Sequence, residues 1–385
     1  MTFSLGVAIF AMFFGAGNII FTLALGSEVG SNVNSAFIGL FITAIFLPLI
    51  GLISTILFQG DYKKFFNRTG GLLGFFLAMA CMLLLGPFGA IPRCAVTSFF
   101  AIKRYIPILS LFHFSIVIFL FIFAFSYRHE LVMDVLGKFL GPLKLIMISV
   151  IVLIGILRST YPIPQIDMQS MEAFIQGCHT GYITMDLLGT FFFAGLFIEN
   201  IERSPEKKEK VLCESLKACY VGALILSCLY IGFCYIAAMY GPKIDVTSGR
   251  YEFLNSLAPY ILGDQWGFGM NIAIAISCFI TAIALTALFA SYLQSVFQFK
   301  NFTYVHSLII TIVISICMTN LGFESIMENI YPVILVCYPV LIVLSVLSLV
   351  EKKLNIQFVK IPVFATFLIS IWNVNLYSFK SLLNL

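Results

Sequence analysis

The residues that could do chemistry in this chain are small and polar side chains that interrupt long apolar runs. Gly15, Ala16, Gly17 and Asn18 form the first interruption, in the middle of an apolar run. Because Gly costs about 1 kcal/mol relative to Ala in a helix interior, this sequence predicts a break in the helix. Unwound backbone there could bind a carboxylate through N–H groups and a cation through carbonyl oxygens. Close packing against another helix is the alternative explanation.

A second interruption lies in the other half of the chain. Tyr182, Thr184 and Asp186 stand at the start of the apolar run 183–200. A carboxylate there is expected at the membrane edge or in a cavity, because its burial in lipid is costly. Its simpler role is that of an acid at a helix N-terminus. The letters FFFAG at 191–195 match FFGAG at 13–17 in four of five positions, which predicts an inverted repeat whose interrupted helices meet at a binding site.

Two further groups of polar or helix-breaking residues lie within apolar runs. Pro87 and Pro92 remove backbone donors and kink a helix. Arg93 follows them, and it is either a cation that bridges helices or a gate that faces the substrate. Ser277 and Thr281 are four residues apart and share a helix face, so their hydroxyls could coordinate a small cation. They could equally bond backbone carbonyls of their own helix.

Composition identifies the setting of these residues. Of 385 residues, 61% are apolar or aromatic and 10% are charged. Soluble domains carry about 45–50% apolar and about 25% charged residues. Together with a mean hydropathy of +1.04, these values exclude a soluble enzyme, a disordered chain and a nucleic-acid binder. The cysteines show no CxxC and no Cys/His spacing typical of zinc, so no cofactor is predicted.

The chain is therefore predicted to be an all-α, multi-pass membrane protein. A membrane helix needs about 20 mostly apolar residues. About eleven runs meet this requirement: 4–25, 35–58, 71–100, 111–126, 139–157, 183–200, 216–240, 268–297, 302–320, 326–350 and 357–378. The segment 158–182 is too polar to span and is expected to be a loop with a short surface helix. With the N-terminus in the cytoplasm, fifteen Lys and Arg fall in cytoplasmic loops and six in outer loops, which favours that orientation.

These motifs, in this order, resemble the bacterial branched-chain amino acid:cation symporter family. The resemblance is carried by FAMFFGAGNIIF at 10–21, GPFGAIPRCAVTSF at 86–99, GYITMDLLG at 181–189, CFITAIALTA at 278–287, TNLGFESI at 319–326 and IYPVIL at 330–335. That family resembles the sodium-coupled inverted-repeat transporters of LeuT type. The resemblance implies one transporter domain over 1–385, with five-helix repeats at 1–157 and 181–350 and an extra C-terminal span at 351–385.

The resemblance also implies roles for matching residues. The substrate site would comprise Gly15, Ala16, Gly17 and Asn18 in the first half. Tyr182, Thr184 and Asp186 would complete it from the second half. Sodium, the coupling ion, would be held by Ala16 and Asn18 with Ser277 and Thr281. Pro87, Pro92 and Arg93 would have structural or gating roles.

Several positions depart from the family pattern. Thr22 and Leu23 stand where the family usually has two prolines, and Phe100 and Ser291 stand where it usually has acids. Members usually have twelve spans, and eleven are counted here. The loss of both acids is expected to reflect either one lost polar contact or altered ion coupling. The ten-helix core is present, so the missing last span need not abolish transport.

The expected function is secondary active import of leucine, isoleucine and valine, coupled to sodium, across the bacterial cytoplasmic (inner) membrane. The expected partners are the amino acid, sodium and the lipid bilayer, and no nucleic acid. The alternative within the same fold is a proton-coupled permease for other neutral amino acids, with Glu324, Glu328 or Asp186 as proton carrier. An enzyme is disfavoured because the four His are scattered near loops, and a channel because no filter segment is visible.

Overall fold

The computed structural model describes residues 2–127, 141–159, 162–202, 211–244, 250–297, 301–354 and 358–382, and every regular element among them is a helix. The α-helices are α1 (Thr2–Phe13), α2 (Ala16–Val29), α3 (Val33–Phe41), α4 (Leu47–Ile56), α5 (Tyr62–Asn67), α6 (Gly71–Leu85), α7 (Ala90–Lys103), α8 (Leu111–Ser126), α10 (Gly141–Arg158), α11 (Ser170–Thr184), α12 (Asp186–Glu202), α13 (Val211–Tyr240), α14 (Arg250–Leu262), α15 (Asp264–Val296), α16 (Tyr304–Asn320), α17 (Phe323–Leu354) and α18 (Lys360–Leu382). Short 3-10 helices at Gly30–Asn32 and Gly241–Lys243 and a π-helix at Ile42–Phe46 complete the list.

Long apolar helices dominate the described part of the chain. Five helical runs are long and apolar enough to cross a membrane: Gly17–Ile56, Gly71–Lys103, Leu212–Lys243, Asp264–Val296 and Phe323–Glu351. Five shorter apolar helices lie at Leu111–Ser126, Leu145–Arg158, Asp186–Gly195, Tyr304–Asn320 and Lys360–Val374. Each predicted apolar run overlaps one of these helices. The prediction of an all-α, multi-pass membrane bundle is therefore confirmed.

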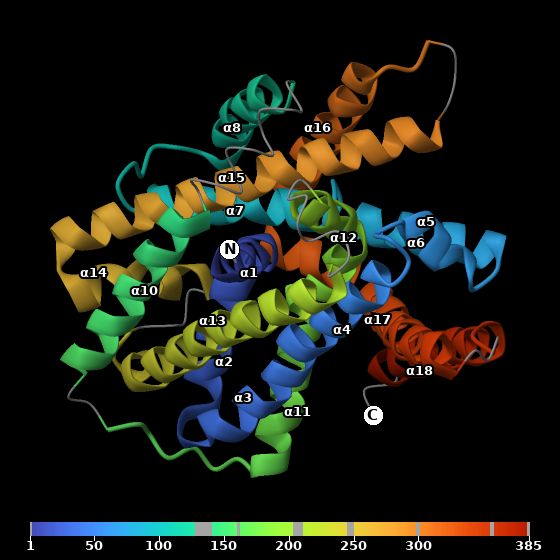
Figure 1. Cartoon of the computed structure of the whole chain (residues 1–385). Coiled ribbons are helices and arrows are strands. Elements are labelled where there is room, and N and C mark those ends of the chain that lie inside the picture. The colour runs from blue at the N-terminus through green and yellow to red at the C-terminus, as the bar shows by residue number, and fades with distance from the viewer. Residues whose placement is uncertain are drawn as a thin grey trace.

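Most of the helices form two groups, and α2 contacts helices of both (Figure 1). In the first group α13 packs against α1 and α2, α11 against α3, and α12 against α4. In the second group α15 packs against α7, α14 and α16, and α16 packs against α8. In the view of Figure 1, α8, α15 and α16 lie toward the top, and α3 and α11 toward the bottom. Helix α17 packs against both α4 and the C-terminal helix α18.

The prediction for 158–182 is confirmed only in part: residues 162–169 form no regular element, but the helix that follows is longer and more buried than expected. The segment ends in α11, which is a full helix of 15 residues packed against α3. Glycines allow the two backbones to approach closely. A Cβ atom at Gly177 would lie 2.8 Å from the carbonyl carbon of Ala36, and one at Gly181 would lie 2.7 Å from the Cβ of Thr43. Small residues at such crossings are typical of membrane helix pairs.

The third predicted run, 71–100, also differs from a single helix. It is divided into α6 and α7 by a turn at residues 86–89. Pro87 lies in that turn, and Pro92 lies in the first turn of α7, where a missing backbone N–H breaks no intrahelical bond. The two prolines thus help to end one helix and begin the next. Arg93 follows directly, so the turn determines where its side chain enters the bundle.

Candidate functional site

The first helix break lies at Phe14 and Gly15, between α1 and α2. Ala16, Gly17 and Asn18, which the sequence placed in the break, form the first turn of α2 instead. Gly15 has an extended backbone, with φ −101° and ψ −176°. Its N–H donates to Oδ1 of Asn18 over 3.1 Å. The Asn18 side chain therefore fixes how the chain enters α2, whose N-terminal N–H groups carry the positive end of the helix dipole.

The second break lies at Met185, between α11 and α12. Met185 has a left-handed backbone, with φ 65° and ψ 18°, and its side chain is buried. A non-glycine residue in this conformation costs roughly 1–3 kcal/mol, so the surrounding packing must hold it. Asp186 begins α12 at this break. Asp186 is thus an acid at a helix N-terminus, as the simpler explanation predicted, and the break places it directly after the end of α11.

A buried polar cluster joins the two breaks. Nδ2 of Asn18 donates to Oδ2 of Asp186 over 2.7 Å and also contacts the hydroxyl of Tyr230. The Tyr230 hydroxyl donates to the same Asp186 oxygen over 3.4 Å. Asn18 is 1% exposed and Asp186 is 7% exposed. Hydrogen bonds from two donors to one carboxylate oxygen offset part of the desolvation of that carboxylate.

Arg93 reaches from α7 in the second helix group to both breaks in the first group. Its Nη1 donates to the carbonyl of Ile183 over 2.8 Å, at the end of α11. Its guanidinium carbon lies 5.4 Å from the centre of the Phe21 ring, on α2. A Cβ at Gly17 would lie 3.0 Å from Nη2 of Arg93, so a side chain there would press on the guanidinium. Arg93 bridges helices, as one of its two predicted roles required; its gating role stays a prediction.

Tyrosines pack around the second break. The ring of Tyr182 lies 4.8 Å from the ring of Tyr338, centre to centre. The Tyr338 hydroxyl accepts from the backbone N–H of Leu187 over 3.3 Å. Thr184 directs its hydroxyl to the carbonyl of Gly181 over 2.8 Å. Tyr230 and Tyr338 were not predicted, because neither has a spacing that distinguishes it among the 16 tyrosines of the chain.

The proposed cation hydroxyls lie on α15, which also contacts α2. Ser277 is buried and Thr281 is half-buried. The hydroxyl of Thr281 donates to the carbonyl of Ser277 over 3.0 Å, as the alternative explanation predicted. Within the described residues, neither hydroxyl has a hydrogen bond to the segment 15–18. The structure thus brings Asn18, Asp186, Thr184 and Arg93 together, and places Ser277 and Thr281 on a separate helix.

Over most of its length, the sequence is similar to proteins described as transporters of branched-chain amino acids. Residues 1–382 match the family described as branched-chain amino acid transport protein. The branched-chain amino acid permease BrnQ of Bacillus subtilis is 29% identical over 362 residues, which cover 90% of this chain and 80% of the permease. The branched-chain amino acid transport system 3 carrier protein of Pseudomonas aeruginosa is 31% identical over 354 residues, which cover 90% of this chain and 79% of the carrier.

Solved structures with a similar fold are also transporters. A crystal structure of an Eremococcus coleocola manganese transporter mutant aligns with a TM-score of 0.62 and 14% identity, over 98% of this chain and 86% of that one. A closed nucleobase-cation-symport-1 family transporter aligns with a TM-score of 0.61 and 14% identity, over 99% and 93%. A sodium-coupled sialic acid symporter aligns with a TM-score of 0.61 and 12% identity, over 97% and 89%. These similarities establish the LeuT-type inverted-repeat fold.

Proposed function

Because this chain belongs to the branched-chain amino acid transport protein family, we propose that it is a secondary active importer of leucine, isoleucine and valine, driven by a sodium gradient. Family membership supports transport of branched-chain amino acids across a membrane. The sodium gradient is the finer part of the proposal. It is supported by the hydroxyl groups of Ser277 and Thr281 on α15, a helix that contacts α2, because oxygen ligands suit a hard cation.

The substrate site of this proposal lies between the two breaks. The N-terminal N–H groups of α2, at Ala16, Gly17 and Asn18, would bind the substrate carboxylate at the positive end of the helix dipole. The guanidinium of Arg93 adds positive charge close to Gly17. The carboxylate of Asp186 and the last carbonyls of α11 would bind the substrate amine. The observation that carries the proposal is the hydrogen bond between Asn18 and Asp186, which places the two breaks side by side.

Apolar side chains near the cluster suit a branched aliphatic substrate. The ring of Phe14 lies 6.0 Å from that of Tyr230, and the ring of Phe21 lies 5.8 Å from that of Phe323. All four rings are buried. One methylene in an apolar pocket is worth about 1–3 kcal/mol, so we expect modest discrimination among leucine, isoleucine and valine.

The transport cycle would move the first helix group against the second. Sodium and substrate together would stabilise an occluded state, and rocking of the groups would open the site to alternate sides. The contact of Arg93 with Ile183 crosses between the groups, so it must change during such a movement. Sodium would be held by carbonyls of Ala16 and Asn18 with the hydroxyls of Ser277 and Thr281.

The test is uptake of labelled leucine into liposomes that contain the purified protein. We expect concentrative uptake with an inward sodium gradient, competed by isoleucine and valine. Thr281→Ala should reduce this uptake by about tenfold or more at a fixed sodium concentration, since it removes one ion ligand. Thr281→Ser keeps the hydroxyl and should retain uptake. Equal loss in both variants, or no sodium-driven uptake by folded protein, would contradict the sodium assignment.

A proton-coupled permease is the second candidate, and the burial of Asp186 favours it. Glu324 and Glu328, the other candidate proton carriers, are both exposed on α17. In this case uptake would follow a proton gradient without sodium. Asp186→Asn would abolish proton-driven uptake. Glu172 is an exposed acid on α11, and Glu172→Gln would leave that uptake unchanged. Sodium dependence that persists at zero proton gradient would exclude this candidate.

A further inference from the structure

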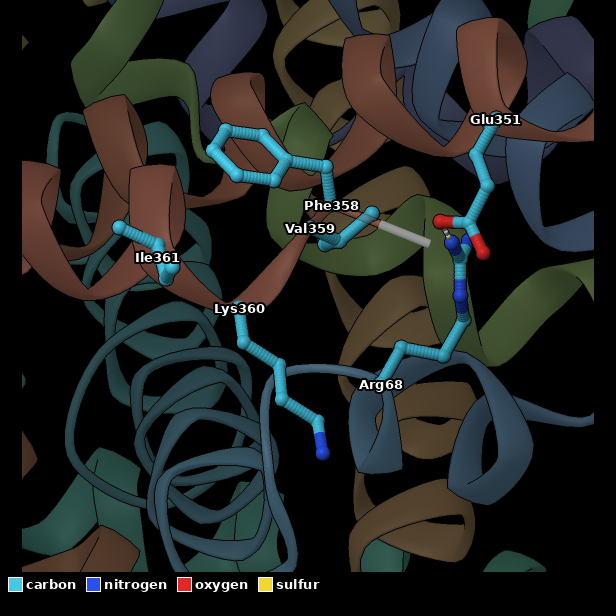
Figure 2. A pocket seen from close by; sticks show the side chains of 6 residues that line it. All are labelled: Arg68, Glu351, Phe358, Val359, Lys360 and Ile361. Carbon is cyan, nitrogen blue, oxygen red and sulfur yellow. Dashed lines mark ion pairs between the residues drawn. The ribbon is translucent and has the colours of Figure 1, made fainter. Parts of the chain in front are cut away.

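A second site lies away from the helix breaks, where three apolar helices begin or end. A cavity of about 430 Å³ is lined by Arg68, Glu351, Phe358, Val359, Lys360 and Ile361. Figure 2 shows that these side chains come from three places: the turn before α6, the end of α17 and the beginning of α18. The Arg68 guanidinium faces the Glu351 carboxylate, and the two form an ion pair.

The cavity carries surplus positive charge. Glu351 pairs with Arg68, whose guanidinium also lies 4.6 Å from the centre of the Phe58 ring. Nη1 of Arg68 and Oε2 of Glu351 are both buried, and the Arg68 side chain is 14% exposed. Lys360 is exposed, and no carboxylate among the described residues forms an ion pair with it. Two cations and one carboxylate leave one positive charge, and the exposed ammonium group of Lys360 is available to an anion.

The position of the cavity suits a lipid headgroup. It lies at the junction of α17 with α18 and beside the start of α6, all of which are apolar helices. In the sequence, basic residues are frequent before α6 and around the junction of α17 with α18: Lys63, Lys64, Arg68, Lys352, Lys353 and Lys360. Such clusters are attracted to anionic lipids of the cytoplasmic leaflet, by about 1 kcal/mol per basic residue near the surface.

The apolar part of the cavity suits acyl chains. Phe358 is 57% exposed and Ile361 is 66% exposed, and both flank Lys360 in sequence. An inorganic phosphate would contact only the cations. A phospholipid would also cover these two apolar side chains, which adds hydrophobic stabilisation.

We propose that this cavity binds an anionic phospholipid, with its phosphate at the ammonium group of Lys360 and its acyl chains over Phe358 and Ile361. The ion pair between Arg68 and Glu351 forms the opposite part of the cavity lining. The bound lipid joins α18 to the turn before α6. This assignment concerns lipid binding and is independent of which ion drives transport.

The test counts lipids retained by the delipidated full chain in native mass spectrometry, after titration with phosphatidylglycerol or phosphatidylcholine. We expect a saturable phosphatidylglycerol site that Lys360→Ala weakens by about fivefold, the factor for one basic residue near the surface. Lys63→Ala is the matched control, because Lys63 is exposed on the same connection as Arg68 but does not line the cavity. Lys63→Ala should weaken binding clearly less than Lys360→Ala, because only Lys360 lines the cavity.

Three outcomes would overturn the proposal. Equal weakening by Lys360→Ala and Lys63→Ala would indicate nonspecific attraction to a basic surface. Equal retention of phosphatidylcholine would show that the headgroup charge is not recognised. Full competition by soluble glycerol phosphate at the affinity of the lipid would indicate a site for free phosphate instead. The thermal unfolding midpoint of each variant in neutral lipid verifies that it is folded, and no transport assay enters the result.

Discussion

At the residue scale, the side chain of Asn18 has two functions in the first break. Its Oδ1 accepts from Gly15 and its Nδ2 donates to Asp186. The sequence could predict Asn18 and Asp186, because polar residues within apolar runs are rare enough to stand out. It could not predict Tyr230, because a tyrosine in an apolar helix has no such contrast with its neighbours. Its position opposite Asp186 depends on how α13 packs, which no local pattern contains.

We predict that Asn18→Ala is more harmful than Tyr230→Phe. Asn18→Ala removes the Gly15 contact and the bond to Asp186, and hydrogen bonds to a charged group are worth about 1.5–3 kcal/mol. Leucine uptake should fall by about 10–100-fold, with a lower thermal unfolding midpoint. Tyr230→Phe removes one hydroxyl and leaves the bond between Asn18 and Asp186 intact, so it should lose less. The reverse order would show that Tyr230, and not Asn18, organises the cluster.

We also predict that Arg93→Lys impairs transport in folded protein. The planar guanidinium reaches the Ile183 carbonyl with Nη1 while Nη2 stays close to Gly17, and a single ammonium group cannot occupy both positions. We expect maximal leucine uptake to fall about tenfold. Lys103→Arg, a conservative change at an exposed lysine in the last turn of α7, is the control. Uptake by Arg93→Lys equal to that of the control would contradict a positioning role for Arg93.

At the element scale, polarity alone misled the prediction for α11. Ser170, Glu172 and Gln176 make this helix look like a surface segment, yet its opposite face is buried against α3. Gly177 and Gly181 are four residues apart, which is the spacing of a close helix crossing. That signal was present in the sequence. The left-handed backbone of Met185 could not be predicted, because a methionine in an apolar run gives no indication of a positive φ.

We predict that Gly177→Ala destabilises the bundle. Its Cβ would lie 2.8 Å from the carbonyl carbon of Ala36, which is backbone and cannot rotate away. Overpacking of this kind costs typically 1–3 kcal/mol. The thermal unfolding midpoint in detergent should fall by several degrees. Gly269→Ala in α15 is the control, because nothing lies within 4 Å of the added Cβ. It should be neutral or slightly stabilising, since Ala favours helix.

At the scale of the whole molecule, connections that the span count places on one side of the membrane contact one another. Asn32 donates to the carbonyl of Met168, and Arg158 donates to the carbonyl of Ile261. Tyr304 donates to the carbonyl of Ser126, on the other predicted side. The alternation of spans could therefore be predicted from hydropathy alone. Which side of the membrane faces the cytoplasm depends on the placement of Lys and Arg in the loops, and it stays a prediction.

We predict that Lys63 faces the cytoplasm and Glu172 the outside. The exposed thiols Cys213, Cys228 and Cys317 would first be changed to Ser. In that background Lys63→Cys should react with an impermeant maleimide only in inside-out vesicles, and Glu172→Cys only in right-side-out vesicles. The parent without an introduced thiol gives the background reaction. Exchange of the two patterns would invert the proposed orientation.

The bond between Asn18 and Asp186 also has a consequence for how the protein is made. The two partners are 168 residues apart, and Tyr230 follows later still. At about 5–20 residues per second, the ribosome needs about 8–34 s to reach Asp186 after Asn18. During this interval the nascent first half lacks the partners of the Asn18 Nδ2 group. A pause in synthesis before Asp186 would therefore prolong an unfinished state, in which the first span is more exposed to membrane proteases than in the completed protein.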